Sequence, residues 1–268
     1  MDFCDTRDLL AVRSRKSVIL MNSSTGEHVS RLEGHSDDIY SLCFDGSGDY
    51  LLTGSYDNSV ILWSLADGSH IRTFKGHPHF VRDVCFLRDD WVVSGSYDSI
   101  VKVWSRDSGE CLCTLETKTG NHVYSLAVNS DQSRLAVAGN NCCVIWSVPD
   151  FKVVWKLERW TGDITFHPTV PDEWVTGRKD IQVWKKGECV DTLKGHSAAI
   201  WSLCFHPTGS VLFSGSSDKT IRANTVQVHV KEHIVAVVAA WARQCAVEIP
   251  TDLVQLVVRS LSGSDLGK

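Results

Sequence analysis

The sequence predicts an all-β fold made of small antiparallel sheets that stack radially around an axis. Three observations lead to this prediction. A segment of about 42 residues recurs along most of the 268-residue chain. Each copy holds four short runs of β-branched, aromatic or other apolar residues, separated by Gly, Asp, Asn and Ser. A single four-stranded sheet cannot bury both of its faces, whereas sheets stacked around an axis cover one another and protect their edges.

The most complete copy spans residues 34–75 and opens with Gly34-His35. Its four apolar runs lie at 39–44, 50–54, 60–63 and 70–74. The middle section recurs as TGSYDNSVILW (53–63), SGSYDSIVKVW (94–104), AVAGNNCCVIW (136–146), VTGRKDIQVW (175–184) and SGSSDKTIRAN (214–224). Successive Trp residues in these sections are 41, 42 and 38 residues apart. AVRSRKSVILM (11–21) belongs to a partial copy at the amino terminus, which we expect to lack its first strand.

The Gly-His start, the Ser-Gly-Ser-x-Asp turn and the strand ending in Trp resemble the WD-repeat β-propeller family. The resemblance covers roughly residues 8–231. It implies about six blades, five from full repeats and one from the partial amino-terminal repeat. No copy carries the Trp-Asp pair itself, because Trp63, Trp104 and Trp146 are followed by Ser and Trp184 by Lys.

The resemblance also implies a structural hydrogen-bond tetrad in each copy. A buried Asp needs compensating partners, which a His and a Ser or Thr hydroxyl provide, while an indole N–H can only donate. The implied members are His35, Thr53 (or Ser55), Asp57 and Trp63 in the first full copy, His77, Ser94, Asp98 and Trp104 in the second, and His196, Ser214 and Asp218 in the fifth, where Asn224 takes the Trp position. The third copy has Thr119, Asn140 and Trp146 at these positions, and the fourth has Thr176, Asp180 and Trp184 without a His.

We expect the propeller to occupy residues 1–232 and a tail to occupy residues 233–268. Residues 230–241 have two interpretations: a strand that completes the first blade and closes the ring, or the start of a helix pair, since AVVAAWARQCAV is Ala-rich. A break at 248–252 and a narrow apolar stripe after it favour a helix at the end of the tail. An incomplete seven-bladed ring is a third interpretation. The apolar tail also suggests oligomerisation through pairing with another chain.

One rim of the propeller is a common partner site in this family, and the resemblance places nine residues on it. They are Asp38, Tyr40, Tyr56, Phe80, Arg82, Tyr97, His122, Tyr124 and Trp201. Seven of the nine are Tyr, Phe, Trp or Arg, and Tyr, Trp and Arg are the residue types that carry most interface energy. Rings packed under neighbouring loops are the alternative explanation, and Tyr56 and Tyr97 at the tips of tight turns should be the most exposed.

Several other functions are not indicated by the sequence. The Ser, His and Asp residues recur at the repeat period and no G-x-S-x-G motif is present, so we expect no catalytic residues and no enzyme activity. The His and Cys pairs lack metal-ligand spacing, and no Gly-rich phosphate loop occurs, so we expect neither a metal nor a cofactor. A net charge of −5 without a basic run argues against nucleic acid. The sequence shows no signal peptide and no apolar run long enough to span a membrane, and its ten cysteines are typical of a reduced, cytoplasmic or nuclear protein.

The leading hypothesis is a non-enzymatic interaction scaffold that binds a protein or peptide on one propeller rim, within a multiprotein complex. The alternative is a substrate-receptor subunit of a ubiquitin ligase. For that alternative, IPTDLVQLVVRSL (249–261) faintly resembles the opening of an F-box, but the family's ligase-adaptor motif Trp-Asp-x-Arg is absent. A propeller hydrolase would need an acidic or His cluster around the central channel.

Overall fold

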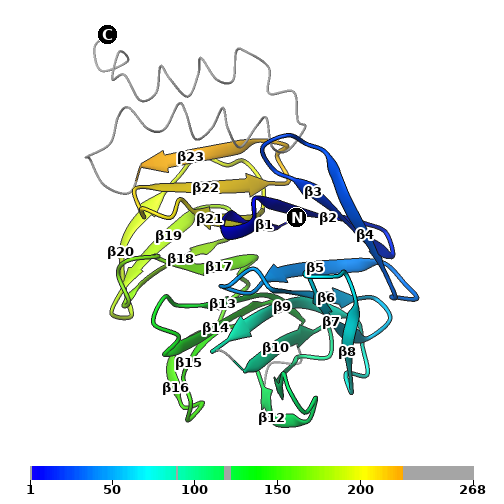
Figure 1. Cartoon of the computed structure of the whole chain (residues 1–268). Helices are drawn as coiled ribbons and strands as arrows, with labels where there is room; N and C mark the ends of the chain where they lie inside the picture. The colour runs from blue at the N-terminus through cyan, green and yellow to red at the C-terminus, as the bar shows by residue number, and fades with distance from the viewer. Residues whose placement is uncertain (1, 89, 118–121, 226–268) are drawn as a thin grey trace.

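The computed structural model describes residues 2–88, 90–117 and 122–225, which form six antiparallel sheets arranged around a central axis (Figure 1). We name these sheets blades 1 to 6 in chain order. Blade 1 contains β1 (Asp2–Cys4), β2 (Leu9–Ser14), β3 (Ser17–Asn22) and β4 (His28–Glu33), and blade 2 contains β5 (Ile39–Phe44), β6 (Tyr50–Ser55), β7 (Ser59–Ser64) and β8 (His70–Lys75). Blade 3 contains β9 (Val81–Leu87), β10 (Trp91–Ser96), β11 (Ile100–Ser105) and β12 (Cys111–Glu116), and blade 4 contains β13 (Val123–Val128), β14 (Arg134–Gly139), β15 (Cys143–Ser147) and β16 (Val153–Leu157). Blade 5 contains β17 (Asp163–Phe166), β18 (Glu173–Gly177), β19 (Ile181–Lys185) and β20 (Glu188–Leu193), and blade 6 contains β21 (Ile200–Phe205), β22 (Val211–Ser216) and β23 (Ile221–Thr225). The predicted all-β propeller of six blades is confirmed.

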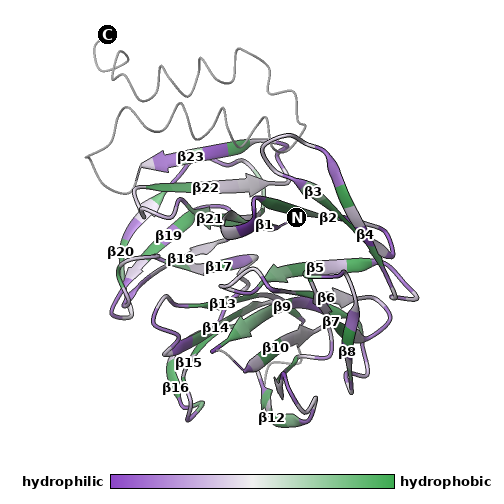
Figure 2. Ribbon diagram, in the orientation of Figure 1, coloured by the Kyte–Doolittle hydropathy of each residue, from purple (hydrophilic) through white to green (hydrophobic). Residues whose placement is uncertain are grey.

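Each blade is an antiparallel meander whose first strand lies nearest the axis (Figure 1). The second strands β6, β10 and β14 are buried along nearly their whole length, because neighbouring blades cover both of their faces. The outermost strands, such as β8 and β20, are largely exposed. Polar residues concentrate in the turns, whereas apolar residues occur in the inner strands and also in outer strands such as β12 and β16 (Figure 2).

The core lies between blades rather than inside any one of them. Five clusters of buried side chains are found in the described residues, one between each pair of consecutive blades from 1 and 2 to 5 and 6. The repeated Gly of the Ser-Gly-Ser motif makes this packing possible. A Cβ atom on Gly54 would lie 2.8 Å from Val81 Cγ1 of the next blade, and one on Gly177 would lie 2.9 Å from Ile200 Cγ2.

Blade 1 corrects one prediction. We expected the partial amino-terminal copy to lack its first strand, but β1 supplies it and pairs antiparallel with β2, with Asp2 opposite Ala11 and Cys4 opposite Leu9. A short 3-10 turn, Asp5–Arg7, connects the two strands. The Asp2 side chain also accepts a hydrogen bond from the Phe44 N–H of blade 2 at 2.8 Å. The sequence pattern hid this strand because it is only three residues long and contains a charged residue.

Blade 6 has three strands within the described residues. Residues 226–268 lie outside the described part of the chain. The two interpretations of residues 230–241, the domain boundary at 232, the tail at 233–268 with its expected oligomerisation and the F-box-like stretch at 249–261 therefore stay predictions.

Candidate functional site

Four of the six inner strands carry a β-bulge at their second residue. The register of each inner strand against its neighbour skips one residue there, and the skipped residues are Tyr40, Arg82, Tyr124 and Trp201. A bulge leaves its extra residue out of the hydrogen-bond ladder and re-aims the side chain. All four bulges lie at the end of the blade where the inner strand begins, so their side chains gather on one rim of the ring. In blade 5, Gly162 occupies the equivalent position, immediately before Asp163.

Ring side chains form a continuous surface along this rim. Tyr56 stacks on Phe80 with ring centroids 4.3 Å apart, and Phe80 stacks on Tyr97 at 4.5 Å. Tyr40 packs against both Tyr56 and Phe80 at 5.5 and 5.6 Å, which begins the series in blade 2. The series therefore joins blades 2 and 3 through direct ring contacts, which contribute beyond their area burial.

The same series continues into blades 4, 5 and 6. Tyr97 stacks on His122, and His122 contacts Tyr124 at 6.4 Å. Tyr124 meets Trp201 edge-on at 5.8 Å, which the absence of a side chain at Gly162 permits. Trp201 in turn meets the ring of Trp160, just before blade 5, with ring centroids 5.5 Å apart. We call the set the aromatic ridge: Tyr40, Tyr56, Phe80, Tyr97, His122, Tyr124, Trp160 and Trp201.

Serine side chains hold the ridge loops in place. Ser55 Oγ donates to the carbonyl oxygens of Asp37 and Asp38 at 3.1 and 3.0 Å. Ser96 Oγ makes the same pair of contacts with His79 and Phe80 at 3.0 and 2.9 Å. The second Ser of the Ser-Gly-Ser motif thus fixes the loop that precedes each inner strand, which pre-organises the rings above it.

The ridge is partly buried, with exposed points at both ends. Tyr56 and Trp201 are each 45% exposed, whereas the other ridge rings are half-buried. The hydroxyls of Tyr40, Tyr56 and Tyr97 make no hydrogen bond to any described residue, so they are available to a partner. Arg82 lies over the Tyr40 ring at 4.8 Å. Burial raises the pKa of Tyr124, whose hydroxyl donates to Asn140 Oδ1 at 2.5 Å.

The structure places the nine rim residues of the sequence analysis as follows. Seven of them are ridge rings, Arg82 covers the first of these rings, and Asp38 contributes its backbone carbonyl while its side chain is exposed. Tyr97, expected to be among the most exposed, is half-buried because it is stacked between Phe80 and His122. Sequence reasoning missed Trp160, which lies two residues before Gly162 just as Phe80 lies two residues before Arg82; blade 5 has no Gly-His pair from which to count this position, but the spacing from Phe166 could have found it.

The implied tetrads form hydrogen-bonded networks below the rim. In blade 2, Trp63 Nε1 donates to Thr53 Oγ1 at 2.9 Å, so the Thr53 hydroxyl hydrogen is free for His35 Nε2 at 2.7 Å. His35 Nδ1 then lies 2.8 Å from Asp57 Oδ2. Burial opposes ionisation of Asp57, but hydrogen bonds from His35 and Ser59 outweigh it and lower the pKa of Asp57 well below its usual range. Ser55 stands outside this network.

The other blades keep this network to different degrees. Blade 3 repeats it through His77, Ser94, Asp98 and Trp104 at 2.7 to 3.1 Å. Blade 6 keeps the His196 contacts with Asp218 and Ser214 at 2.8 and 2.9 Å, and Asn224 stands opposite Leu212 where a Trp would be. Blade 5 keeps only the bond from Trp184 Nε1 to Thr176 at 2.9 Å. In blade 4, Asn140 bonds to Tyr124 instead, and Thr119 lies outside the described residues.

Two buried carboxylates near the axis were not anticipated from the sequence. Asp83 accepts from Ser41 Oγ of blade 2 at 2.6 Å and from the Leu126 N–H of blade 4 at 2.7 Å. Asp163 accepts from the Leu203 N–H of blade 6 at 2.6 Å. Burial raises the pKa of both, and that of Asp163 to about 7. Each carboxylate links neighbouring blades. The signal that sequence reasoning overlooked is a polar residue recurring between apolar neighbours on the inner strands.

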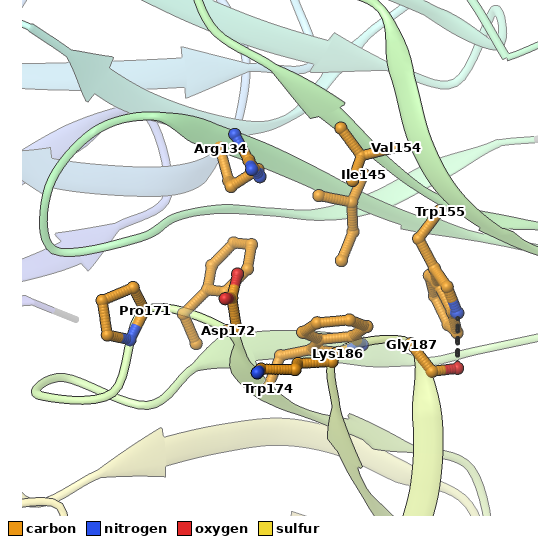
Figure 3. Close-up of a pocket in the computed structure, with 10 residues that line it drawn as sticks. Arg134, Ile145, Val154, Trp155, Pro171, Asp172, Trp174, Lys186 and Gly187 are labelled. Carbon is orange, nitrogen blue, oxygen red and sulfur yellow. Dashed lines mark hydrogen bonds between the residues drawn. The ribbon is translucent and has the colours of Figure 1, made fainter.

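A pocket of about 230 Å³ lies between blades 4 and 5, on the face opposite the ridge (Figure 3). Ile145, Val154 and Trp174 contribute apolar walls, and Trp155 Nε1 donates to the Gly187 carbonyl at 3.1 Å. The indole N–H of Trp174 is buried and has no hydrogen-bond partner among the described residues. Arg134, Asp172 and Lys186 also line the pocket, so its lining combines apolar walls with charged side chains (Figure 3).

Among residues 2–88, 90–117 and 122–225, no group of three or more His, Cys, Asp or Glu side chains is arranged to hold a metal ion. Within the same ranges, no helix has the length and apolar character needed to cross a membrane.

The family model described as "WD domain, G-beta repeat" matches residues 26–64, 68–105, 109–147 and 187–223, together more than half of the chain. The chain belongs to the WD40 repeat family. The matched segments leave out most of blades 1 and 5. They include blades 2, 3 and 6, which retain the His and Asp of the network, and also the first three strands of blade 4, which does not.

Curated relatives share WD40 repeats with part of this chain. Nuclear distribution protein PAC1 of Arthroderma benhamiae is 31% identical over 109 residues, which cover 37% of this chain and 23% of that protein. Nuclear distribution protein nudF 1 of Talaromyces marneffei is 26% identical over 102 residues, 35% of this chain and 22% of the relative. Nuclear distribution protein nudF of Aspergillus flavus is 44% identical over 54 residues, 19% of this chain and 12% of the relative. The chain thus matches less than a quarter of the length of these relatives.

Proposed function

We propose that this WD40 protein is a non-enzymatic scaffold that binds a protein or peptide through the aromatic ridge. The observation that carries the proposal is the continuous series of ring contacts from Tyr40 to Trp201 on one rim. Tyr and Trp supply large contact area and a polar handle at low entropic cost, and contiguous exposed apolar surface usually marks a binding site. The alternative is that the rings only pack the rim loops. That alternative does not account for three Tyr hydroxyls left without a described partner.

The scaffold beneath the ridge suits a binding role. Sites built on rigid elements with a supporting shell hold their geometry better than sites on free loops. Here the bulges, the Ser55 and Ser96 contacts and the blade 2 and blade 3 tetrads together fix the loops that carry the rings.

The arrangement of polar groups supports a non-catalytic protein. Both ring nitrogens of His35, His77 and His196 are engaged with a carboxylate and a hydroxyl inside the fold, and the three histidines are buried. A general base has to reach the proton of a substrate, and these side chains face their own network. We accordingly propose no cofactor and no metal.

We further propose that the protein works in the cytoplasm or nucleus as part of a multiprotein complex. Eight cysteines in the described residues are free thiols, which fits a reducing compartment: Cys4, Cys43, Cys85, Cys111, Cys113, Cys143, Cys189 and Cys204. Similarity to nuclear distribution proteins supports an interaction role, but it covers too little of those proteins to transfer their partners.

The experiment is affinity purification from native lysate with quantitative mass spectrometry. A ridge variant, Tyr56→Ala with Trp201→Ala, is compared with the intact chain and with a control, Val29→Ala with Val190→Ala. The control residues are 53% and 56% exposed on the outer strands β4 and β20, so both variants remove exposed hydrophobic groups. Specific partners should be retained by the control and lost by the ridge variant. Equal recovery on all three proteins would contradict the proposal.

A further inference from the structure

The turns that join the second and third strands of the blades divide the ridge rim by charge. In blades 2 and 3 these turns carry Tyr56 and Tyr97, followed by an Asp of the tetrad. In blades 5 and 6 the same turns carry Arg178, Lys179 and Lys219. All three cations are exposed, and none forms an ion pair with a described residue.

Hydrogen bonds place these cations beside Trp201. The Arg178 carbonyl accepts from the N–H of Ile200 at 2.6 Å, which fixes the blade 5 turn next to the start of β21. The indole N–H of Trp201 donates to Ser217 Oγ at 2.7 Å, in the turn that contains Lys219. Trp201 therefore lies between two basic turns.

The carboxylates of these two turns offset only part of the positive charge. Asp218 accepts hydrogen bonds from Thr220, the Ser197 N–H and His196, and the Thr220 bond in particular keeps the pKa of Asp218 well below its usual range, so this carboxylate is ionised. Asp180, in the blade 5 turn, is half-buried. The three exposed cations thus outnumber the two carboxylates, neither of which is fully exposed.

The opposite end of the ridge is mixed in charge. Arg15 and Lys16 of blade 1 are exposed near Tyr40, because the Arg15 carbonyl accepts from the Ile39 N–H at 2.8 Å and Lys16 Nζ donates to the Ser36 carbonyl at 2.5 Å. Arg13 is also exposed there, and its guanidinium donates to the Tyr40 carbonyl. Asp37 and Asp38 are exposed in the same loop, so the exposed charges at this end have both signs, whereas the exposed charges of the two turns beside Trp201 are all positive.

We propose that the ridge takes a two-part peptide segment, with aromatic or proline side chains on the rings and acidic side chains over the basic turns beside Trp201. This inference rests on the proposed function and specifies its ligand. Proline-rich and aromatic segments dock on aromatic surfaces whose hydroxyls meet their carbonyl groups, and complementary charge fixes register and speeds association. A single-stranded nucleic acid also uses rings and cations. Three cations at one end of the ridge only, with Asp37 and Asp38 exposed at the other end and a net charge of −5 on the chain, favour a short acidic peptide.

The test is selection of a displayed random library of 12-residue peptides on the intact chain. Parallel selections use the basic-turn variant Arg178→Ala, Lys179→Ala, Lys219→Ala, and the ridge variant Tyr56→Ala, Trp201→Ala. A matched control, Arg88→Ala, Lys152→Ala, Lys186→Ala, removes three exposed cations from the opposite face. Enriched peptides should combine Phe, Trp or Pro with neighbouring Asp or Glu. Their affinity should fall at least tenfold on the basic-turn variant, fall with added salt and stay unchanged on the control.

The alternative outcomes separate this inference from the proposed function. Enriched peptides that depend on Tyr56 and Trp201 but lack acidic residues, or that bind the basic-turn variant normally, overturn the charge inference alone. Enrichment that is indifferent to the ridge variant, or no enrichment at all, overturns both. Displacement of the peptides by a dodecathymidine oligonucleotide at equal concentration would point to nucleic acid and contradict the inference.

Discussion

Removing the Thr53 hydroxyl tests whether the tetrads stabilise the blades that support the ridge. The change is Thr53→Val, which keeps the side-chain shape at a fully buried position, so no cavity is created. It leaves the Trp63 N–H without an acceptor and His35 Nε2 without a donor. An orphaned buried polar group costs about 1–3 kcal/mol, so the two together should lower the free energy of unfolding by about 2–6 kcal/mol.

Blade 6 provides the comparison, because its network lacks the Trp. Ser214→Ala orphans only His196 Nε2 and should cost about half as much, about 1–3 kcal/mol. Urea unfolding followed by far-ultraviolet circular dichroism gives the loss of stability, and native-state hydrogen exchange shows in which blade protection falls. A cost below 1 kcal/mol for Thr53→Val, or equal costs for the two variants, would refute the reasoning.

Two further predictions concern the contacts between blades. Gly95→Ala should destabilise the fold by about 1–3 kcal/mol, because its new Cβ would collide with Val123 of the next blade. The equivalent change in blade 6, Gly215→Ala, should be tolerated, because the nearest atom to the new Cβ is 3.8 Å away. Thermal unfolding compares the two variants, and equal melting temperatures would contradict the packing account. Asp163→Asn should abolish the part of the pH dependence of folding stability that this carboxyl group causes. Because burial raises the pKa of Asp163 to about 7, the folded protein binds the extra proton between about pH 4 and 7, and this contribution to stability is lost as pH rises through that range, by at most about 1.4 kcal/mol per pH unit. The stability of the variant relative to the wild type should thus increase from pH 4 to pH 7 in urea unfolding, and a constant difference would contradict the assignment.

The repeat period made most of the architecture predictable from the sequence. Strand positions, the number of blades and the pairing of the Gly-His histidine with the turn Asp all depend on local patterns that recur at a fixed spacing. The choice between Thr53 and Ser55 did not follow from the pattern, because both hydroxyls are fully buried in the same strand. Thr53 and Ser55 point to the same face of the strand, and their positions along it decide the matter: the Trp63 indole reaches Thr53, whereas Ser55, nearer the end of the strand, reaches the loop carbonyls.

Features that break the repeat could not be predicted in the same way. The strand Asp2–Cys4 is too short to show a pattern, and its position depends on the Phe44 N–H from another blade. Trp160 occupies the position of Phe80 in blade 3, but blade 5 has lost the His from which that position is counted. The raised pKa of Asp163 follows from burial between blades, which only the assembled ring creates.

The central claim is that the aromatic ridge is a binding surface. The most direct test is isothermal titration calorimetry with the partner that the intact chain recovers most specifically. This partner is titrated into the intact chain, the Tyr56→Ala, Trp201→Ala variant and the Val29→Ala, Val190→Ala control. The melting temperature of each protein is measured alongside. Because aromatic anchors at an interface contribute about 2 kcal/mol or more each, the ridge variant should bind at least tenfold more weakly while still folded at the temperature of the titration, and the control should bind normally. Equal affinity of all three proteins would contradict the claim and leave the ridge with a purely structural role.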